Sequence, residues 1–347
     1  NEIYSSMCSL LRNFLNKFFP FWIKKPHKEA KNLKKYLQGS KKNPTKYSES
    51  INYLKKVNYV IAGHNGGLDE YVCHIVNELH TIGIKFGIFG SSMKPNVQQK
   101  SLLNVYEKTF SLSEFNIARN PIGYRWAMEK FPKINFELKP DPAFGMIPAN
   151  DNVVDQIILK YDLTKFFEKP VIMVTTAEPA PISRHSFLNN YNKIEAHRKF
   201  LSNFFKLLAK DKNFNILFLP HTIGPNIRMD DRLISKDVIM RANLDKSINV
   251  KLLTADLSAK DLKGLISRAE FLIAERLHSI IGAIGVNTPF INFASDKDMR
   301  INGILKEQLN LNECIYSLSN PSDSGAYSFF LNLYNNRQNT IKKLQNI

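Results

Sequence analysis

The sequence predicts an α/β protein with two Rossmann-like domains that face each other across a cleft, an arrangement called GT-B-like. Three observations lead to this prediction. The 347 residues are enough for two α/β domains. Short apolar runs alternate with amphipathic segments along most of the chain, which is typical of parallel sheets covered by helices. A turn-rich break at 139–145 separates a first series of such units from a second.

Apolar runs predict the strands, and segments with helical spacing predict the helices between them. In the first half we expect strands at 58–63, 84–89, 114–118 and 135–138, and helices at 69–80, 97–110 and 122–131. In the second half we expect strands at 171–174, 215–219, 249–253, 271–274 and 289–293, and helices at 191–209, 230–242, 258–268 and 327–344. The predicted domains are therefore residues 1–150 and 165–325, with a C-terminal helix at 326–347 that packs back across both.

Composition and cysteine usage indicate a cytoplasmic globular protein. Hydrophobic residues make up 44% of the chain and the mean hydropathy is −0.26. No run approaches the ~20 apolar residues of a membrane-spanning helix. Cys8, Cys73 and Cys314 are isolated in the sequence, so they suggest neither a disulfide framework nor a metal site.

The formal net charge is +17, and it is concentrated at the start of the chain. Residues 1–50 hold ten lysines and one arginine against three glutamates, a net charge of +8. Such a surface attracts nucleic acid, anionic lipid or an anionic small substrate. Because no nucleic-acid-binding module is recognisable, we expect no nucleic-acid partner. The alternative explanation of the positive charge is a general compositional bias of the chain toward Lys, Asn and Ile.

The N-terminal segment 7–22 has apolar residues at helical spacing, and six lysines follow at 24–35. A secretory signal would carry its basic residues before the apolar core, so this is not one. One interpretation is a helix that lies on an anionic membrane surface, at the inner face of the membrane. The other, which we prefer, is a core-facing helix followed by a basic loop.

Arg276 and His278 are the strongest candidate site residues. They fall between the predicted strand 271–274 and a helix of small residues. A helix that begins at a strand end favours anions, because its free N–H groups and its dipole attract negative charge. Arginine binds phosphate through two hydrogen bonds, and histidine exchanges protons near neutral pH. The structural alternatives are that Arg276 caps a neighbouring helix and that His278 is a histidine of the core.

A second polar cluster follows the strand 215–219. His221 and Asp231 are placed to share a proton or to bind sugar hydroxyls, whereas Asp230 suits an N-cap. No further ligand has a metal-binding spacing, so we predict no metal site. Arg184 lies in a basic loop after the strand 171–174, where it would meet an incoming phosphate or remain solvated.

The loop 63–70, Gly-His-Asn-Gly-Gly-Leu-Asp-Glu, follows a strand and precedes a helix. Its glycines allow a tight turn and close approach of a ligand to the backbone. The spacing fits neither a dinucleotide fingerprint nor a P-loop, and an ordinary turn is the alternative.

The segment Arg276-Leu277-His278, its Ala/Gly-rich helix and the Gly-Val-Asn-Thr-Pro at 285–289 resemble the C-terminal signature of the polysaccharide pyruvyl transferase family. The order of the glycine loop, a strand that ends in Arg119, the Asp141-Pro142-Ala143 segment and the Asp230-Asp231 pair is also similar, over about residues 57–310. The family's first loop usually has more glycines than this one.

The resemblance implies an enzyme that moves a pyruvyl group from phosphoenolpyruvate, without a cofactor, onto a sugar or lipid-linked oligosaccharide acceptor. It implies that phosphoenolpyruvate is bound by Arg276, Leu277, His278 and Arg184, and the acceptor by His64, Asn65, Gly66 and Arg119. His278, or else His221, would donate the proton, and Asp231 or Asp69 would be the base.

Two other functions stay open. One is a nucleotide-sugar-dependent GT-B glycosyltransferase, and the other is a non-catalytic scaffold at the membrane surface. Family members usually begin with a strand and a Gly-Asn-x-Gly-Asp-Glu loop, of which residues 1–4 resemble only the tail. We therefore expect the first sheet to lack one strand, in a fragment or in a trimmed domain.

Overall fold

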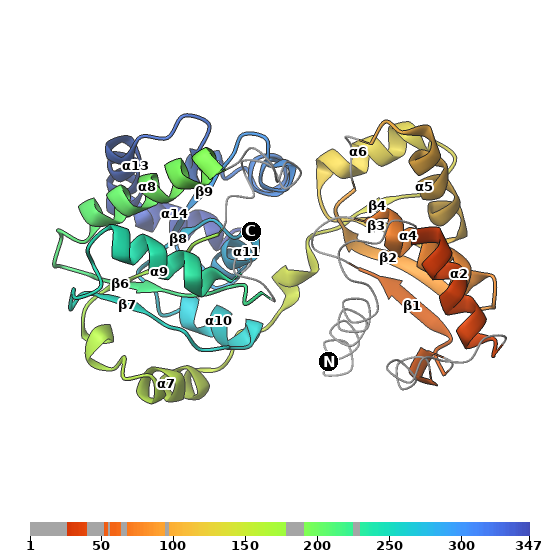
Figure 1. The fold of residues 1–347 in the computed structure, drawn as a ribbon. Helices are drawn as coiled ribbons and strands as arrows, with labels where there is room; N and C mark the ends of the chain where they lie inside the picture. Colours follow the sequence, from red (N-terminus) through yellow and green to blue (C-terminus); the bar gives the residue numbers. More distant parts are fainter. Residues whose placement is uncertain are drawn as a thin grey trace. The chain divides into compact units, whose positions relative to one another are not determined.

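The structure is a computed structural model that describes residues 26–39, 52–54, 56–63, 68–93, 97–177, 191–224 and 230–347. The chain divides into two compact units, Asn1–Asp141 and Pro142–Ile347. Each unit has its own parallel sheet, as the alternation of strands and helices predicts (Figure 1).

The first unit contains a four-stranded parallel sheet in the order β1-β2-β3-β4. Its strands are β1 (Tyr59–Ala62), β2 (Lys85–Ser91), β3 (Asn116–Ala118) and β4 (Glu137–Leu138). Its helices are α2 (Pro26–Leu37), α4 (Glu70–His80), α5 (Lys100–Leu112) and α6 (Pro121–Lys130). Buried residues of β1–β3 and of all four helices form one apolar core.

Helix α2 corrects one expectation, because the lysine-rich segment expected as a loop is helical from Pro26 onward. Ala30, Leu33 and Leu37 follow one another at helical spacing and are buried in the core of the first unit. Exposed lysines occupy the remaining turns, so the segment is an amphipathic helix whose charge hid its apolar stripe. The expected helix at 7–22 lies outside the described residues.

The second unit contains a six-stranded parallel sheet in the order β10-β9-β8-β5-β6-β7. The strands are β5 (Val171–Thr175), β6 (Asn215–Phe218), β7 (Val250–Leu252), β8 (Phe271–Ala274), β9 (Phe290–Ala294) and β10 (Ile315–Ser317). The chain winds outward from β5 through β6 to β7, then returns to place β8 on the other side of β5. The sheet is therefore doubly wound, and its strand order reverses between β5 and β8.

Helices cover both faces of this sheet, as Figure 1 shows for α8 and α9 on one side and α7 and α10 on the other. The α-helices are α7 (Asp151–Lys160), α8 (Tyr191–Leu208), α9 (Asp231–Arg241), α10 (Ala259–Ile266), α11 (Leu277–Ile284), α12 (Met299–Ile301), α13 (Asp323–Asn335) and α14 (Arg337–Leu344). Short 3-10 helices lie at Pro142–Gly145, Lys165–Glu168 and Asn312–Cys314, and a π-helix at Asn302–Gln308. Helix α13 packs on α8 and β9 within this unit.

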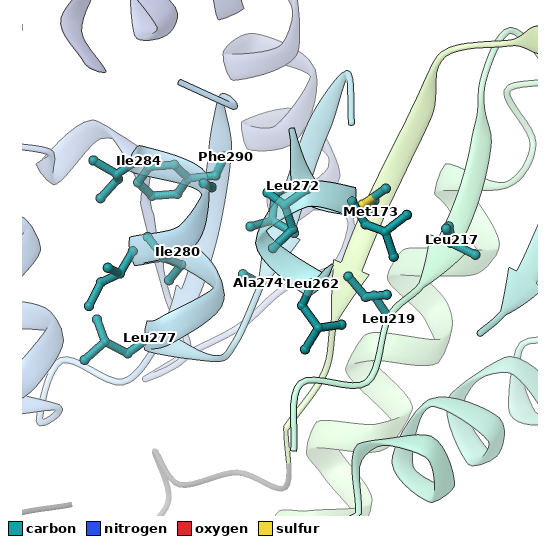
Figure 2. Packing of buried hydrophobic residues seen from close by; sticks show 14 of the residues in the cluster. Met173, Leu217, Leu219, Leu262, Leu272, Ala274, Leu277, Ile280, Ile284 and Phe290 are labelled. Carbon is teal, nitrogen blue, oxygen red and sulfur yellow. The ribbon is translucent and has the colours of Figure 1, made fainter. Parts of the chain in front are cut away.

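Two apolar cores lie on the two faces of the second sheet. Alternate residues of β5 show the division, since Met173 contributes to one core and Ile172 to the other. The first core contains residues of α7, α10 and α11, and Figure 2 shows Leu277 and Ile280 of α11 among them. Within the described residues, no helix is long and apolar enough to cross a membrane.

Candidate functional site

The point where the strand order reverses, between β5 and β8, is where doubly wound sheets place ligands, beyond the carboxyl ends of the strands. Polar residues follow both strands here. Thr175 ends β5, and Glu275 and Arg276 follow β8. The N–H of Glu275 donates to the Thr175 carbonyl over 2.9 Å, so the two strand ends remain in register up to the site.

Helix α11 begins immediately beyond β8, with Arg276 as its N-cap. The Arg276 side chain makes no capping hydrogen bond, so it satisfies none of the free N–H groups of the first turn. Leu277 is 5% exposed and belongs to the apolar core shown in Figure 2. Leu277 therefore has only its backbone to offer to a ligand, whereas His278 is half-buried.

Asp231, in the first turn of α9, is the central carboxylate of the site, and its side chain is fully buried. It accepts hydrogen bonds from the backbone N–H groups of His221 at 3.1 Å and Thr222 at 2.8 Å. It also accepts from Nε of Arg276 at 3.2 Å and forms a close ion pair with Nη2 of the same guanidinium. Burial raises the pKa of the Asp231 carboxyl, and Arg276 and the two N–H groups oppose that shift.

The Asp231 carboxylate holds Arg276 along one edge of its guanidinium, the edge formed by Nε and Nη2. Among the described residues, no hydrogen bond or ion pair joins Nη1 of Arg276 to another group, and the side chain is 20% exposed. Because arginine has donors on two edges, a held guanidinium of this kind can still bind an anion through Nη1 and Nη2. The pair thus orients a cation beside the first turn of α11.

His221 follows β6 and is half-buried beside these groups. Burial of the imidazole, together with the charges of His278 and Arg276, lowers the pKa of His221 to about 3. His221 is therefore neutral near pH 7, when it can accept a hydrogen bond but cannot act as an imidazolium donor. His278 and Arg276 are thus close enough to His221 for their charges to act on it.

Sequence reasoning missed a set of buried hydroxyl groups that brace the site. Ser279 of α11 donates to the Arg276 carbonyl over 2.7 Å and contacts the Thr175 hydroxyl at 2.7 Å. The Thr176 and Ser235 hydroxyls lie 2.8 Å apart and connect the end of β5 to α9. Hydroxyl residues at strand ends and in first helical turns are too common for the sequence to single these out.

Asp69 and Arg119, the predicted site residues of the first unit that the structure describes, have structural partners. Asp69 is the N-cap of α4 and accepts the Val72 N–H at 3.0 Å. Arg119 is 1% exposed; its Nη1 lies 2.7 Å from the carboxylate of Asp141, and its Nε donates to the Ser92 hydroxyl. The structure therefore brings Arg276, His278, His221 and Asp231 together in the second unit, whereas Asp69 and Arg119 belong to the first.

Four predicted residues lie outside the part of the chain that the structure describes: His64, Asn65, Gly66 and Arg184. Within the described residues, no group of three His, Cys, Asp or Glu side chains is arranged to hold a metal ion.

Comparison with known proteins identifies one family. The family model described as polysaccharide pyruvyl transferase matches residues 3–297. No match was found among the curated proteins.

Solved structures similar to this chain are α/β enzymes of GT-B-like fold. A putative UDP-N-acetylglucosamine 2-epimerase from Listeria monocytogenes has a TM-score of 0.56 and 10% identity, covering 94% of this chain and 76% of that one. UDP-GlcNAc 2-epimerase from Neisseria meningitidis, bound to UDP-GlcNAc, has a TM-score of 0.55 and 13% identity, with coverages of 98% and 84%.

An α,α-trehalose-phosphate synthase (UDP-forming) from Burkholderia vietnamiensis has a TM-score of 0.52 and 8% identity, covering 96% of this chain and 83% of that one. At these identities the similarity concerns the fold alone. The chain therefore has an α/β fold of the GT-B-like kind, with two parallel sheets.

Proposed function

Because the chain belongs to the polysaccharide pyruvyl transferase family and is thus an enzyme, we propose that it transfers the pyruvyl group of phosphoenolpyruvate, as a ketal, to two hydroxyls of one sugar. The acceptor is a cell-surface polysaccharide or its lipid-linked precursor. The observation that carries this proposal is the Asp231–Arg276 pair, which fixes a guanidinium beside the first turn of α11.

Phosphoenolpyruvate carries a phosphate and a carboxylate, so its site needs several N–H donors. In the proposal, the Nη1 and Nη2 groups of Arg276 and the first N–H groups of α11 bind the phosphate. The backbone of Leu277 contributes to these N–H groups, since its side chain is in the core. Arg184 supplies a second cation in this scheme.

The reaction requires one proton on the methylene carbon of phosphoenolpyruvate. We assign its transfer to His278, which follows Arg276 in the same turn. Protonation leaves a positive charge on the carbon that carries the phosphate, and the first sugar hydroxyl adds there. The carbon–oxygen bond to phosphate then breaks, and the second hydroxyl closes the ketal. Of the two hydroxyl protons, one replaces that taken from His278 and the other leaves with phosphate.

In the proposal, Asp231 positions Arg276 instead of acting as the base. Its side chain is fully buried and its hydrogen bonds all come from N–H donors, which supports a positioning role. Neutral His221 is better suited to accept a hydrogen bond from the attacking hydroxyl. Asp69 caps α4, so the proposal gives it no proton transfer.

On the acceptor side, the proposal assigns sugar binding to the first domain, through His64, Asn65 and Gly66 after β1. The burial of Arg119 and its pairing with Asp141 support a structural role for this residue rather than contact with the sugar.

Phosphate release from phosphoenolpyruvate, measured with a galactose- or mannose-containing acceptor, tests the proposed function. Arg276→Lys keeps the charge but loses the paired N–H donors of the guanidinium. His278→Gln removes the proton donor. We expect kcat/KM to fall by about 100-fold or more in each variant. Arg241→Lys, in an exposed network with Glu195 and Asp237, is the matched control and should keep its activity.

Release that survives Arg276→Ala and His278→Ala together would overturn the assignment of the site. Turnover of a nucleotide sugar, with none of phosphoenolpyruvate, would instead identify a GT-B glycosyltransferase.

A lipid-linked acceptor would also require contact with the membrane. We propose that the enzyme acts in the cytoplasm at the inner face of the membrane, and that the basic N-terminal segment with α2 contacts anionic lipid. Lys28 and Lys31 of α2 are exposed, so Lys28→Glu with Lys31→Glu should weaken binding to phosphatidylserine vesicles without unfolding the first unit. Unchanged vesicle binding would remove α2 from this proposal.

A further inference from the structure

A second acid–base pair lies directly behind Arg276, and the proposed reaction does not use it. Glu275 precedes Arg276, and its Oε1 lies 2.7 Å from Nε2 of His197 on α8. The two side chains are 4% and 2% exposed. Apart from this contact, neither of the two atoms has a hydrogen-bond partner among the described residues.

Glu275 is fixed to the reversal point of the sheet at three places. Its N–H donates to the Thr175 carbonyl over 2.9 Å, and its Oε2 accepts the Ala177 N–H at 2.9 Å. Its Oε1 contacts His197. The residue therefore joins the end of β5 to the end of β8, immediately before the chain turns into Arg276.

A buried carboxylate is stable only if it is paired with a cation or takes up a proton. His197 is the partner available to Glu275, because its Nε2 lies 2.7 Å from the carboxylate, within ion-pair distance. If His197 were absent, Oε1 of Glu275 would be a buried carboxylate oxygen without a partner among the described residues. A negative charge there would oppose the binding of an anionic substrate.

We infer that His197 and Glu275 are a positioning pair for Arg276, which keep the backbone before it fixed and cancel a negative charge beside the anion site. The inference rests on the proposed function, since it predicts how phosphoenolpyruvate binds. Neither residue touches the substrate. The pair fixes the backbone that precedes Arg276, through the hydrogen bond from the Ala177 N–H to Glu275. Asp231 holds the guanidinium itself.

Steady-state kinetics with phosphoenolpyruvate test the charge. His197→Leu removes the partner and should raise KM for phosphoenolpyruvate about tenfold, with a smaller change in kcat. His197→Gln keeps an N–H donor and should recover most of this loss. Adding Glu275→Gln to His197→Leu removes the unpaired carboxylate and should lower KM again, so the two substitutions are not additive.

Glu270→Gln is the matched control, because Glu270 stands at the opposite end of β8 and pairs with Nε of Arg337 at 2.6 Å. It should leave KM unchanged. Equal effects of Glu275→Gln and Glu270→Gln on KM, or additive effects of His197→Leu and Glu275→Gln, would show that the pair serves stability only and would overturn the inference.

A measurement without turnover separates this inference from the proposed function. In ¹H–¹⁵N spectra of the arginine side chains, the Arg276 Nε–H signal, identified by its loss in Arg276→Lys, should shift in His197→Leu and stay in place in Glu270→Gln. An Arg276 signal that is unchanged in His197→Leu would overturn the inference. Absence of phosphate release by the unsubstituted enzyme would overturn the proposed function, while the spectra would still decide whether the pair positions Arg276.

Discussion

Replacing Asp231 by asparagine should destabilise the second unit and weaken the binding of phosphoenolpyruvate together. The substitution keeps the shape of the side chain but turns one oxygen into an N–H donor that faces the Arg276 guanidinium. Breaking a buried ion pair costs about 3–5 kcal/mol. Because the Arg276 side chain is 20% exposed and can regain water, we expect a loss of about 3 kcal/mol, at the lower end of that range.

For a unit of this size, about 3 kcal/mol corresponds to a decrease in Tm of roughly 6–12 °C. The released guanidinium should also lower kcat/KM for phosphoenolpyruvate by about 10- to 100-fold, or about 1.4–2.7 kcal/mol. Thermal unfolding and phosphate release measure the two effects on the same preparation.

Asp230→Asn is the control for this prediction. Asp230 is the N-cap of α9 and pairs with Arg232, whose side chain is 33% exposed. Asparagine caps a helix as well as aspartate does, and the partly exposed Arg232 can regain water when the pair is lost, so Tm should fall much less than in Asp231→Asn. If Asp231→Asn proved as mild as Asp230→Asn in both measurements, Asp231 would not hold Arg276 in the way described.

Three further predictions concern stability. The native pKa of His221 is about 3, whereas that of a histidine in an unfolded chain is about 6.5. As the pH drops, the unfolded state therefore binds the proton first. The free energy of unfolding should consequently fall below about pH 6.5. His221→Asn should make urea unfolding less sensitive to pH between about 6.5 and 4, and an unchanged slope would refute this. Arg119→Met should cost the first unit about 3–5 kcal/mol, with partial recovery on adding Asp141→Asn, measured by urea unfolding. Gly87→Ala should cost about 1–3 kcal/mol, because the added Cβ would lie 2.3 Å from the Phe115 ring; a Tm equal to that of the unsubstituted protein would contradict it.

The regular elements of the fold could be predicted where a segment has a clear hydrophobic period. The strand 271–274 coincides with β8, and the helix 230–242 differs from α9 by one residue at each end. Helix α2 was expected as a loop because its lysines obscured the apolar stripe. The single C-terminal helix at 327–344 is two helices, α13 and α14, with Asn336 between them.

The composition of the site was predictable only in part. Arg276, His278, His221 and Asp231 follow strands or begin helices, so their position at one edge of the sheet follows from the strand order. Their roles depend on contacts between distant segments, which the sequence does not show. Asp231 contacts Arg276, 45 positions away, and Glu275 contacts His197 on another helix.

The roles of residues in the first unit were also hard to predict, because they too depend on contacts between distant segments. Arg119 directly follows β3, which made it a candidate for substrate contact, but its guanidinium is buried against Asp141, 22 positions later. A charged residue at a strand end can therefore belong to a buried structural pair, as Arg119 does, or keep a partly exposed side chain, as Arg276 does at 20%.

The most direct test of the proposed pyruvyl transfer uses phosphoenolpyruvate labelled with ¹³C at the carbon that carries the phosphate. After incubation with a galactose- or mannose-containing acceptor, the label should appear in the sugar product as a ketal carbon bonded to two oxygens, with release of one phosphate per ketal. Arg276→Lys and His278→Gln should prevent its appearance. If the label stayed in phosphoenolpyruvate while a nucleotide sugar was consumed under the same conditions, the proposed reaction would be contradicted.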